Sequence, residues 1–182
     1  MNFEITILEN ADSIAKTVAE KALSEVQNAI ATKGTAELVL TGGTLGTAVL
    51  ESMRNASLVT EIDWQKVHIW WSDERFVEID SHERNDLQAV NALLRHISIP
   101  ASNIHFPETT TNTVSVNKAA NAYEEDLLEH FGSKEAIYFD VLLLGIGPDG
   151  HIASLFPGQE TLDSKSLVVA VTNSPKPPPE RI

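Results

Sequence analysis

The stretch Phe139–His151, FDVLLLGIGPDGH, decides the fold. Its first half, Phe139–Leu144, is dominated by apolar residues, which is typical of a strand buried on both faces of a parallel sheet. Its second half contains three glycines, a proline, an aspartate and a histidine. Two shorter apolar runs, Leu38–Leu40 and Val67–Trp71, also end in polar or glycine-rich segments. We therefore expect three buried parallel strands that deliver polar loops to one edge of a sheet.

Helical periodicity separates these strands. Apolar residues recur at spacings of three and four before Gly34, which predicts a helix capped by Asn10 or Asp12 and stopped by the glycine. Similar patterns predict helices from the Gly42-Gly43 pair through Met53, over Glu83–Ile97 and over Val116–Phe131, with further strands at Phe3–Leu8 and Leu167–Val171. Alternating strands and helices predict an α/β fold with an open, mostly parallel, doubly wound, Rossmann-like sheet. We expect one domain over residues 1–182.

Composition excludes several classes of function. The 182 residues include no cysteine, so disulfides, iron–sulfur clusters and cysteine nucleophiles are excluded. With 26 acidic and 13 basic residues the net charge is −13, which opposes binding to nucleic acid or an anionic membrane. The start of the chain does not resemble a signal peptide. We expect a cytoplasmic protein that acts on a small molecule without nucleic-acid or membrane partners, with a monomer favoured.

Three loops are predicted to meet at the carboxyl edge of the sheet, where open α/β sheets bind their ligands. They are Thr41–Thr44, Ser72–Arg75 and Gly145–His151. Tight turns need glycine, but that need does not explain why acidic and basic side chains and a histidine gather at one edge. The third loop also matches the G-x-G-x-x-G dinucleotide fingerprint. We reject a nicotinamide cofactor because Pro148 removes a backbone donor and a proline follows too soon for a crossover helix.

The residue types in these loops suggest a phosphorylated substrate and proton transfer. His151 is the candidate acid–base group, and either Asp149 or Asp73 could be its partner. Gly42, Gly43 and Thr44 could bring backbone donors and a helix N-terminus to an anion. Arg75 could bind a phosphate, Asp73 could accept bonds from sugar hydroxyls, and Lys176 and Arg181 stand on a stiff proline segment.

The other histidines form no recognisable motif. They are His68, His82, His96, His105 and His130. No H-E-x-x-H or similar ligand spacing occurs, so we expect no metal site and assign these residues to the surface or to packing.

Four segments resemble the 6-phosphogluconolactonase family. They are Leu40–Gly43, Trp71–Val77, Glu83–Asn85 and, above all, Gly145–Gly158, GIGPDGHIASLFPG. The ending Ser174–Arg181 is also similar to that family. The resemblance extends from the second predicted strand to the end of the chain, and it implies the sugar-phosphate isomerase type of sheet.

The resemblance implies a pentose-phosphate enzyme that hydrolyses 6-phospho-D-glucono-1,5-lactone to 6-phosphogluconate without a cofactor. His151 would be the general base, and Asp149 would orient it. The implied substrate-binding positions are Gly42, Gly43, Thr44, Asp73, Arg75, Asn85, Gly147, Lys176 and Arg181.

Three departures and two alternatives accompany this resemblance. The usual Gly-Gly-Ser is Gly-Gly-Thr here, ending at Thr44, and the threonine that usually follows the histidine is Ile152. Members of the family also continue past Arg181, so we expect a C-terminal strand and helix to be missing. The related glucosamine-6-phosphate deaminases carry a glutamate after the shared motif, where this chain has Phe156. The remaining alternative is a non-catalytic sugar-phosphate sensor.

Overall fold

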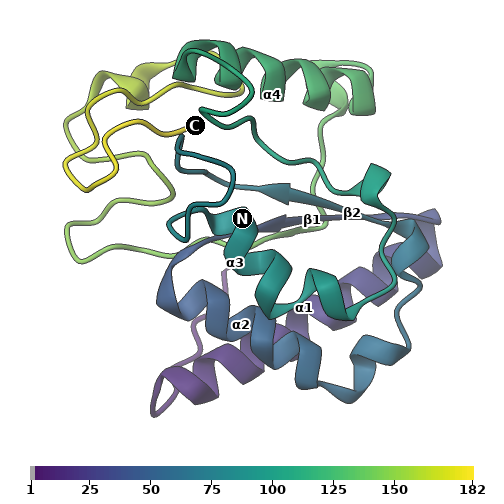
Figure 1. Ribbon diagram of the computed structural model, residues 1–182. Helices are drawn as coiled ribbons and strands as arrows, with labels where there is room; N and C mark the ends of the chain where they lie inside the picture. The colour runs from purple at the N-terminus through teal and green to yellow at the C-terminus, as the bar shows by residue number, and fades with distance from the viewer. Residues whose placement is uncertain (1–2) are drawn as a thin grey trace.

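A sheet of three parallel strands lies at the centre of the molecule. The computed structural model describes residues 3–182. The strands β1 (Ala36–Leu40), β2 (Val67–Trp71) and β3 (Val141–Leu142) have the order β2-β1-β3 (Figure 1). Leu38 of β1 pairs with Ile69 on one side and with Val141 on the other. The predicted parallel pairing of these three segments is confirmed.

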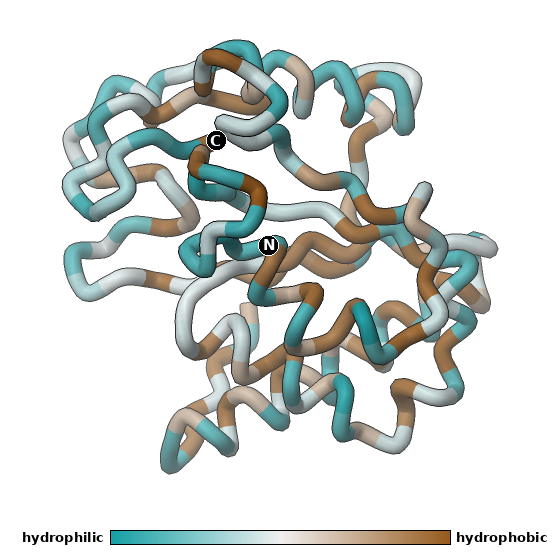
Figure 2. Tube along the Cα trace, viewed as in Figure 1, coloured by the Kyte–Doolittle hydropathy of each residue, from teal (hydrophilic) through white to brown (hydrophobic). Residues whose placement is uncertain are grey.

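Helices cover both faces of the sheet. Helices α1 (Ala11–Lys33), α2 (Gly43–Asn55) and α3 (Asn85–Ala92) pack on one face, and α4 (Val116–Phe131) lies on the other (Figure 1). Side chains alternate along each strand. Leu38 and Leu40 therefore enter the core with α1–α3, while Val39 joins the core under α4. Figure 2 shows apolar residues along these strands. The doubly wound arrangement is confirmed.

The two long helices begin and end where the capping residues predict. The side chain of Asn10 accepts a hydrogen bond of 2.9 Å from the Ser13 amide at the start of α1, and Gly34 ends this helix with φ 90°. The side chain of Ser115 caps α4, and Gly132 ends it with φ 79°. These glycines adopt the left-handed conformation that other residues rarely take.

Four predicted elements differ from the structure. Residues 3–8 and 167–171 form no named strand, the predicted helix over 83–97 is α-helical only at α3, and the strand over 139–144 shortens to β3. Phe3, Ile5 and Ile7 of this segment lie in solvent, with Ile7 90% exposed, and Leu8 is half-buried. Leu142 and Leu144 are also about half exposed. Within residues 3–182 no strand pairs with the outer edge of β3. The apolar pattern of residues 139–144 alone is therefore not enough to make β3 longer.

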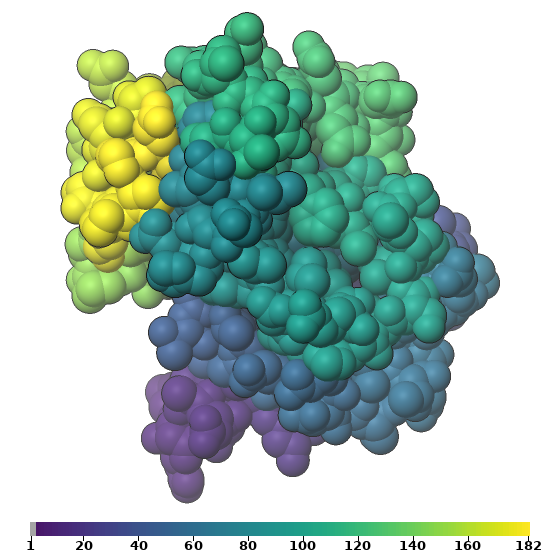
Figure 3. Space-filling view, in the orientation of Figure 1, coloured from purple at the N-terminus to yellow at the C-terminus, as the bar shows by residue number. Residues whose placement is uncertain are grey.

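The C-terminal residues return to the sheet edge that carries the predicted site. The Glu74 and Ile182 backbones exchange two hydrogen bonds of 2.9 Å, and the Val171 and Arg181 backbones exchange two of 2.8 Å. Figure 3 shows the C-terminal residues in yellow against the teal segment that contains residue 75. The tail therefore places its basic side chains beside the Ser72–Arg75 loop.

The length and hydropathy of the described helices bear on whether they could span a lipid bilayer. None of them combines the length and the apolar character that a membrane crossing requires.

Candidate active site

A cavity of about 390 Å³ opens at the carboxyl ends of β1, β2 and β3. The three polar loops converge there, as the sequence predicts. Eight of the predicted residues line it, namely Gly42, Gly43, Asp73, Arg75, Asn85, Gly147, His151 and Arg181. Three others, Thr44, Asp149 and Lys176, lie outside its lining. The spatial prediction that His151 shares one cavity with the Gly42-Gly43 turn is therefore confirmed.

His151 is held by Asp149 and not by Asp73. Its Nδ1 lies 2.6 Å from Asp149 Oδ1, and the Lys176 ammonium donates to the same carboxylate oxygen at 3.0 Å. Since Nδ1 carries the proton that faces the carboxylate, Nε2 is left as the basic nitrogen of the ring. Lys176 Nζ also lies 3.3 Å from Nδ1, but two donors cannot bond each other, so Lys176 acts on Asp149.

Asp149 stays ionised throughout the neutral range. Hydrogen bonds from His151 and Lys176 lower the pKa of Asp149 to about 2. The side chain is 41% exposed, so solvent screens part of its charge. A permanent carboxylate beside Nδ1 fixes the tautomer and stabilises the imidazolium that forms when Nε2 takes a proton.

Gly147 and Phe156 pack against the His151 ring. The ring stacks on Phe156 with centroids 4.7 Å apart. On Gly147, a Cβ atom would lie 1.9 Å from His151 Cε1, so only glycine leaves the ring its place. The histidine side chain is 17% exposed. The sequence pattern placed Gly147 at the site but did not predict the close approach of the His151 ring to it. The pattern assigned no role to Phe156.

The Gly42-Gly43 turn delivers the N-terminus of α2 to the cavity. Helix α2 begins at Gly43, and no side chain caps it. Its first amides and its dipole therefore favour an anion at this point. Gly43 has φ 83°, and a Cβ on Gly42 would lie 1.8 Å from Asn85 Oδ1. Thr44 is exposed within the first turn of the helix.

Two guanidinium groups contribute positive charge to the cavity. Arg75 and Arg181 form an antiparallel bridge between their backbones. Burial, followed by the neighbouring charge of Arg75, lowers the pKa of Arg181. The Arg181 side chain also donates to three backbone oxygens of the proline segment, at Lys176, Pro177 and Pro178. It therefore anchors this segment and faces the cavity at the same time.

Asp73 has a role different from that of Asp149. Its carboxylate accepts a hydrogen bond of 2.5 Å from the Ser154 hydroxyl and lies 3.9 Å from the Arg181 guanidinium. Its backbone oxygen accepts a hydrogen bond of 2.9 Å from the Asn85 side chain. Asp73 thus connects the Ser72–Arg75 loop with Ser154 and with the tail. The sequence contained no signal for the Ser154 contact beyond its place in the family motif.

Glu74 holds the second loop in place from inside the protein. Its carboxylate accepts hydrogen bonds from the amides of Arg75, Asn85 and Asp86, and the Arg84 guanidinium lies 3.8 Å away. Burial raises the pKa of Glu74 to about 7. The sequence alone allowed a solvated loop here, whereas Glu74 is fully buried.

A second cavity of about 310 Å³ lies on the α4 face of the sheet. Its walls are mainly aromatic and aliphatic, with Trp70, Tyr123 and Phe139 among them. The cavity at the carboxyl edge combines a histidine, two arginines and a helix N-terminus, so it is the better candidate for a charged sugar derivative.

Comparisons with known proteins identify the family to which this chain is related. A family model described as glucosamine-6-phosphate isomerases/6-phosphogluconolactonase matches residues 9–182. The chain is 40% identical to a Mycobacterium tuberculosis protein named 6-phosphogluconolactonase, over all of this chain and 74% of that protein. For the Streptomyces coelicolor protein of the same name, identity is 34% over 98% of this chain and 71% of the relative. The crystal structure of 6-phosphogluconolactonase from Thermotoga maritima gives a TM-score of 0.81 at 29% identity, covering 97% of this chain and 74% of that one. The chain belongs to the glucosamine-6-phosphate isomerase/6-phosphogluconolactonase family.

Proposed function

We propose that this chain hydrolyses 6-phospho-D-glucono-1,5-lactone to 6-phosphogluconate in the cytoplasm. The observation that carries the proposal is the Asp149–His151 pair, 2.6 Å apart, at a cavity that two arginines also line. Relatives named 6-phosphogluconolactonase, at 34–40% identity over nearly the whole chain, support the same activity.

Ester hydrolysis needs a base for water and an acid for the leaving oxygen. In the proposed reaction, His151 Nε2 takes a proton from water while the water oxygen attacks the lactone carbonyl carbon. The imidazolium then returns the proton to the ring oxygen as the carbon–oxygen bond breaks. Asp149 stabilises the charged ring between these two steps, because it accepts the Nδ1 proton throughout.

The phosphate end of the substrate needs positive charge at a fixed place. Arg75, Arg181 and the N-terminus of α2 supply it around one cavity. Asp73 and Asn85 are positioned to bond sugar hydroxyls, and the Asn85 Oδ1 atom has no hydrogen-bond partner among the described residues. Lys176 is assigned to the Asp149 carboxylate, which differs from its expected part in phosphate binding.

A deaminase reaction fits this site less well. The glucosamine-6-phosphate deaminases that share the Asp-Gly-His motif carry a glutamate where this chain has Phe156. Here Phe156 is 2% exposed and stacks on the histidine ring, so it supplies no proton-transferring group.

The test is a coupled assay on freshly prepared lactone, corrected for spontaneous opening, with ammonia release from glucosamine 6-phosphate measured in parallel. We expect lactone hydrolysis and no ammonia. Ammonia release would replace the proposal with the deaminase activity. Binding of 6-phosphogluconate without turnover of the lactone would replace it with a sensor.

A further inference from the structure

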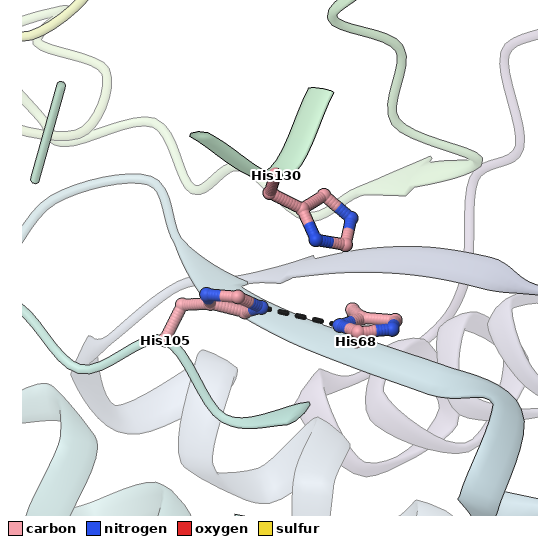
Figure 4. A group of neighbouring side chains, drawn as sticks. All are labelled: His68, His105 and His130. Carbon is pink, nitrogen blue, oxygen red and sulfur yellow. Dashed lines mark hydrogen bonds between the residues drawn. The ribbon is translucent and has the colours of Figure 1, made fainter. Parts of the chain in front are cut away.

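Three histidines from different parts of the chain meet at the end of the sheet opposite the proposed active site. His68 is the second residue of β2, His105 follows the bridge between Ile69 and Ile104, and His130 lies in the last turn of α4. Figure 4 shows the three rings facing a common centre. Sequence spacing could not group them, because they are separated by 37 and 25 positions.

The ring nitrogens are close to the spacing that a metal ion requires. His68 Nδ1 lies 3.2 Å from His105 Nε2, and one nitrogen from each of the three rings lies within 4.8 Å of the others. Ligand atoms about 3.3 Å apart surround a tetrahedral zinc ion with bonds of about 2.0–2.1 Å. The distance between the His68 and His105 nitrogens therefore already matches this spacing. A side-chain rotation of His130 would shorten the distances from its nitrogen to the other two.

Carboxylates lie within hydrogen-bond distance of two of these rings, His105 and His130. His105 Nδ1 lies 3.0 Å from Asp126, and His130 Nε2 lies 3.0 Å from Glu37. The indole of Trp70 donates a hydrogen bond of 2.8 Å to the other Glu37 oxygen and stacks on His105 at 3.6 Å. Carboxylate–histidine pairs of this kind orient metal-bound imidazoles in proteins. They leave His105 Nε2 and His130 Nδ1 as the nitrogens available to an ion.

The local charge also favours a cation. Glu37 is 6% exposed, and within residues 3–182 neither Glu37 nor Asp126 has a lysine or arginine within ion-pair distance. Among the described residues these two carboxylates have only histidines as ion-pair partners, so a bound cation would offset their negative charge.

We propose that His68, His105 and His130 form a binding site for a divalent transition-metal ion of the Zn²⁺ class. Imidazole nitrogen is a preferred ligand of Zn²⁺, Ni²⁺ and Cu²⁺, and three histidines leave a fourth position for water. The ion would connect β2, the segment after Ile104 and the end of α4. The site is distinct from the cavity that His151 lines, since it lies at the amino end of β2 and the cavity lies beyond its carboxyl end.

The test is calorimetric titration of the EDTA-treated chain with Zn²⁺. We expect one equivalent to bind. His130→Gln should weaken binding at least ten-fold, and Asp126→Asn should weaken it by about 10–100-fold, as outer-shell partners do elsewhere. His82→Ala is the matched control, because His82 is exposed and lies outside the cluster, and its affinity should equal that of the unchanged chain.

A second measurement uses Co²⁺ on the unchanged chain, so it does not depend on a variant that folds. Co²⁺ should give visible absorption of a nitrogen-rich tetrahedral site and should quench the fluorescence of Trp70. The absence of uptake of both ions would overturn the proposal. Binding that survives His130→Gln unchanged would place the ion outside this cluster, and binding that 6-phosphogluconate displaces would place it in the cavity that His151 lines; either result would also overturn the proposal.

Discussion

Replacing Gly147 with alanine tests the packing around the His151 ring without changing the chemistry of any group proposed to react. The new Cβ would lie 1.9 Å from His151 Cε1 and 2.1 Å from Nδ1, whereas ordinary contacts begin at 3.4 Å. The ring must therefore move by about 1.5 Å, since 3.4 minus 1.9 is 1.5. Gly147 does not have positive φ, so alanine adds no backbone strain of its own.

Such a movement breaks two contacts that hold the imidazole, namely the 2.6 Å bond to Asp149 and the stack on Phe156. A displacement of about 1 Å at a reacting group costs on the order of 10²-fold in rate. We therefore expect Gly147→Ala to lower kcat for 6-phosphogluconolactone by about 10²-fold or more, with a smaller change in KM.

Gly145→Ala is the matched control in the same loop. A Cβ at Gly145 meets no atom within 4 Å, and its φ is not positive either. In the coupled lactone assay this variant should stay within about two-fold of the unchanged chain, because it leaves the catalytic geometry intact. The reasoning is refuted if the two variants have equal activity, or if Gly147→Ala raises KM alone.

Three further predictions concern charge and packing. Asp149→Asn should lower kcat by about 10²-fold or more, because the imidazolium that forms during the reaction loses its carboxylate; the Asp149 carboxylate itself, with a pKa of about 2, should not titrate in the pH–rate profile near neutral pH. Arg75→Gln should raise KM for the phosphorylated lactone at least ten-fold and leave the unphosphorylated lactone unaffected; equal effects on both substrates would contradict the phosphate assignment. Leu23→Ala should lower the free energy of unfolding by about 2–5 kcal/mol in urea titrations, whereas Leu162→Ala should change it by under about 0.5 kcal/mol, since Leu23 is fully buried and Leu162 is 51% exposed.

Local chemistry explains why most of the fold could be predicted. Asn10 and Gly34 delimit α1, and Ser115 and Gly132 delimit α4, because capping bonds and left-handed glycines act over a few neighbouring residues. Strands depend on distant partners instead. Phe3–Leu8 alternates apolar and polar residues as a strand does. Among the described residues no strand lies beside it, so it has no hydrogen-bonding partner and forms no strand.

The position of the candidate site was predictable, but its contacts were less so. Parallel strands bring their carboxyl ends to one edge, so the convergence of three loops follows from topology. Whether Asp149 or Asp73 bonds His151 depends on the course of one turn, and Lys176 reaches Asp149 only because the tail folds back. The cluster that contains His68 depends on long-range packing and carries no spacing signal at all.

The measurement that tests the central claim most directly is the rate of 6-phosphogluconolactone hydrolysis by His151→Ala beside the unchanged chain, with spontaneous opening subtracted. If Nε2 of His151 is the base for water, kcat/KM should fall by about 10²–10⁴-fold while 6-phosphogluconate still binds. A variant that hydrolyses the lactone at the rate of the unchanged chain would contradict the account.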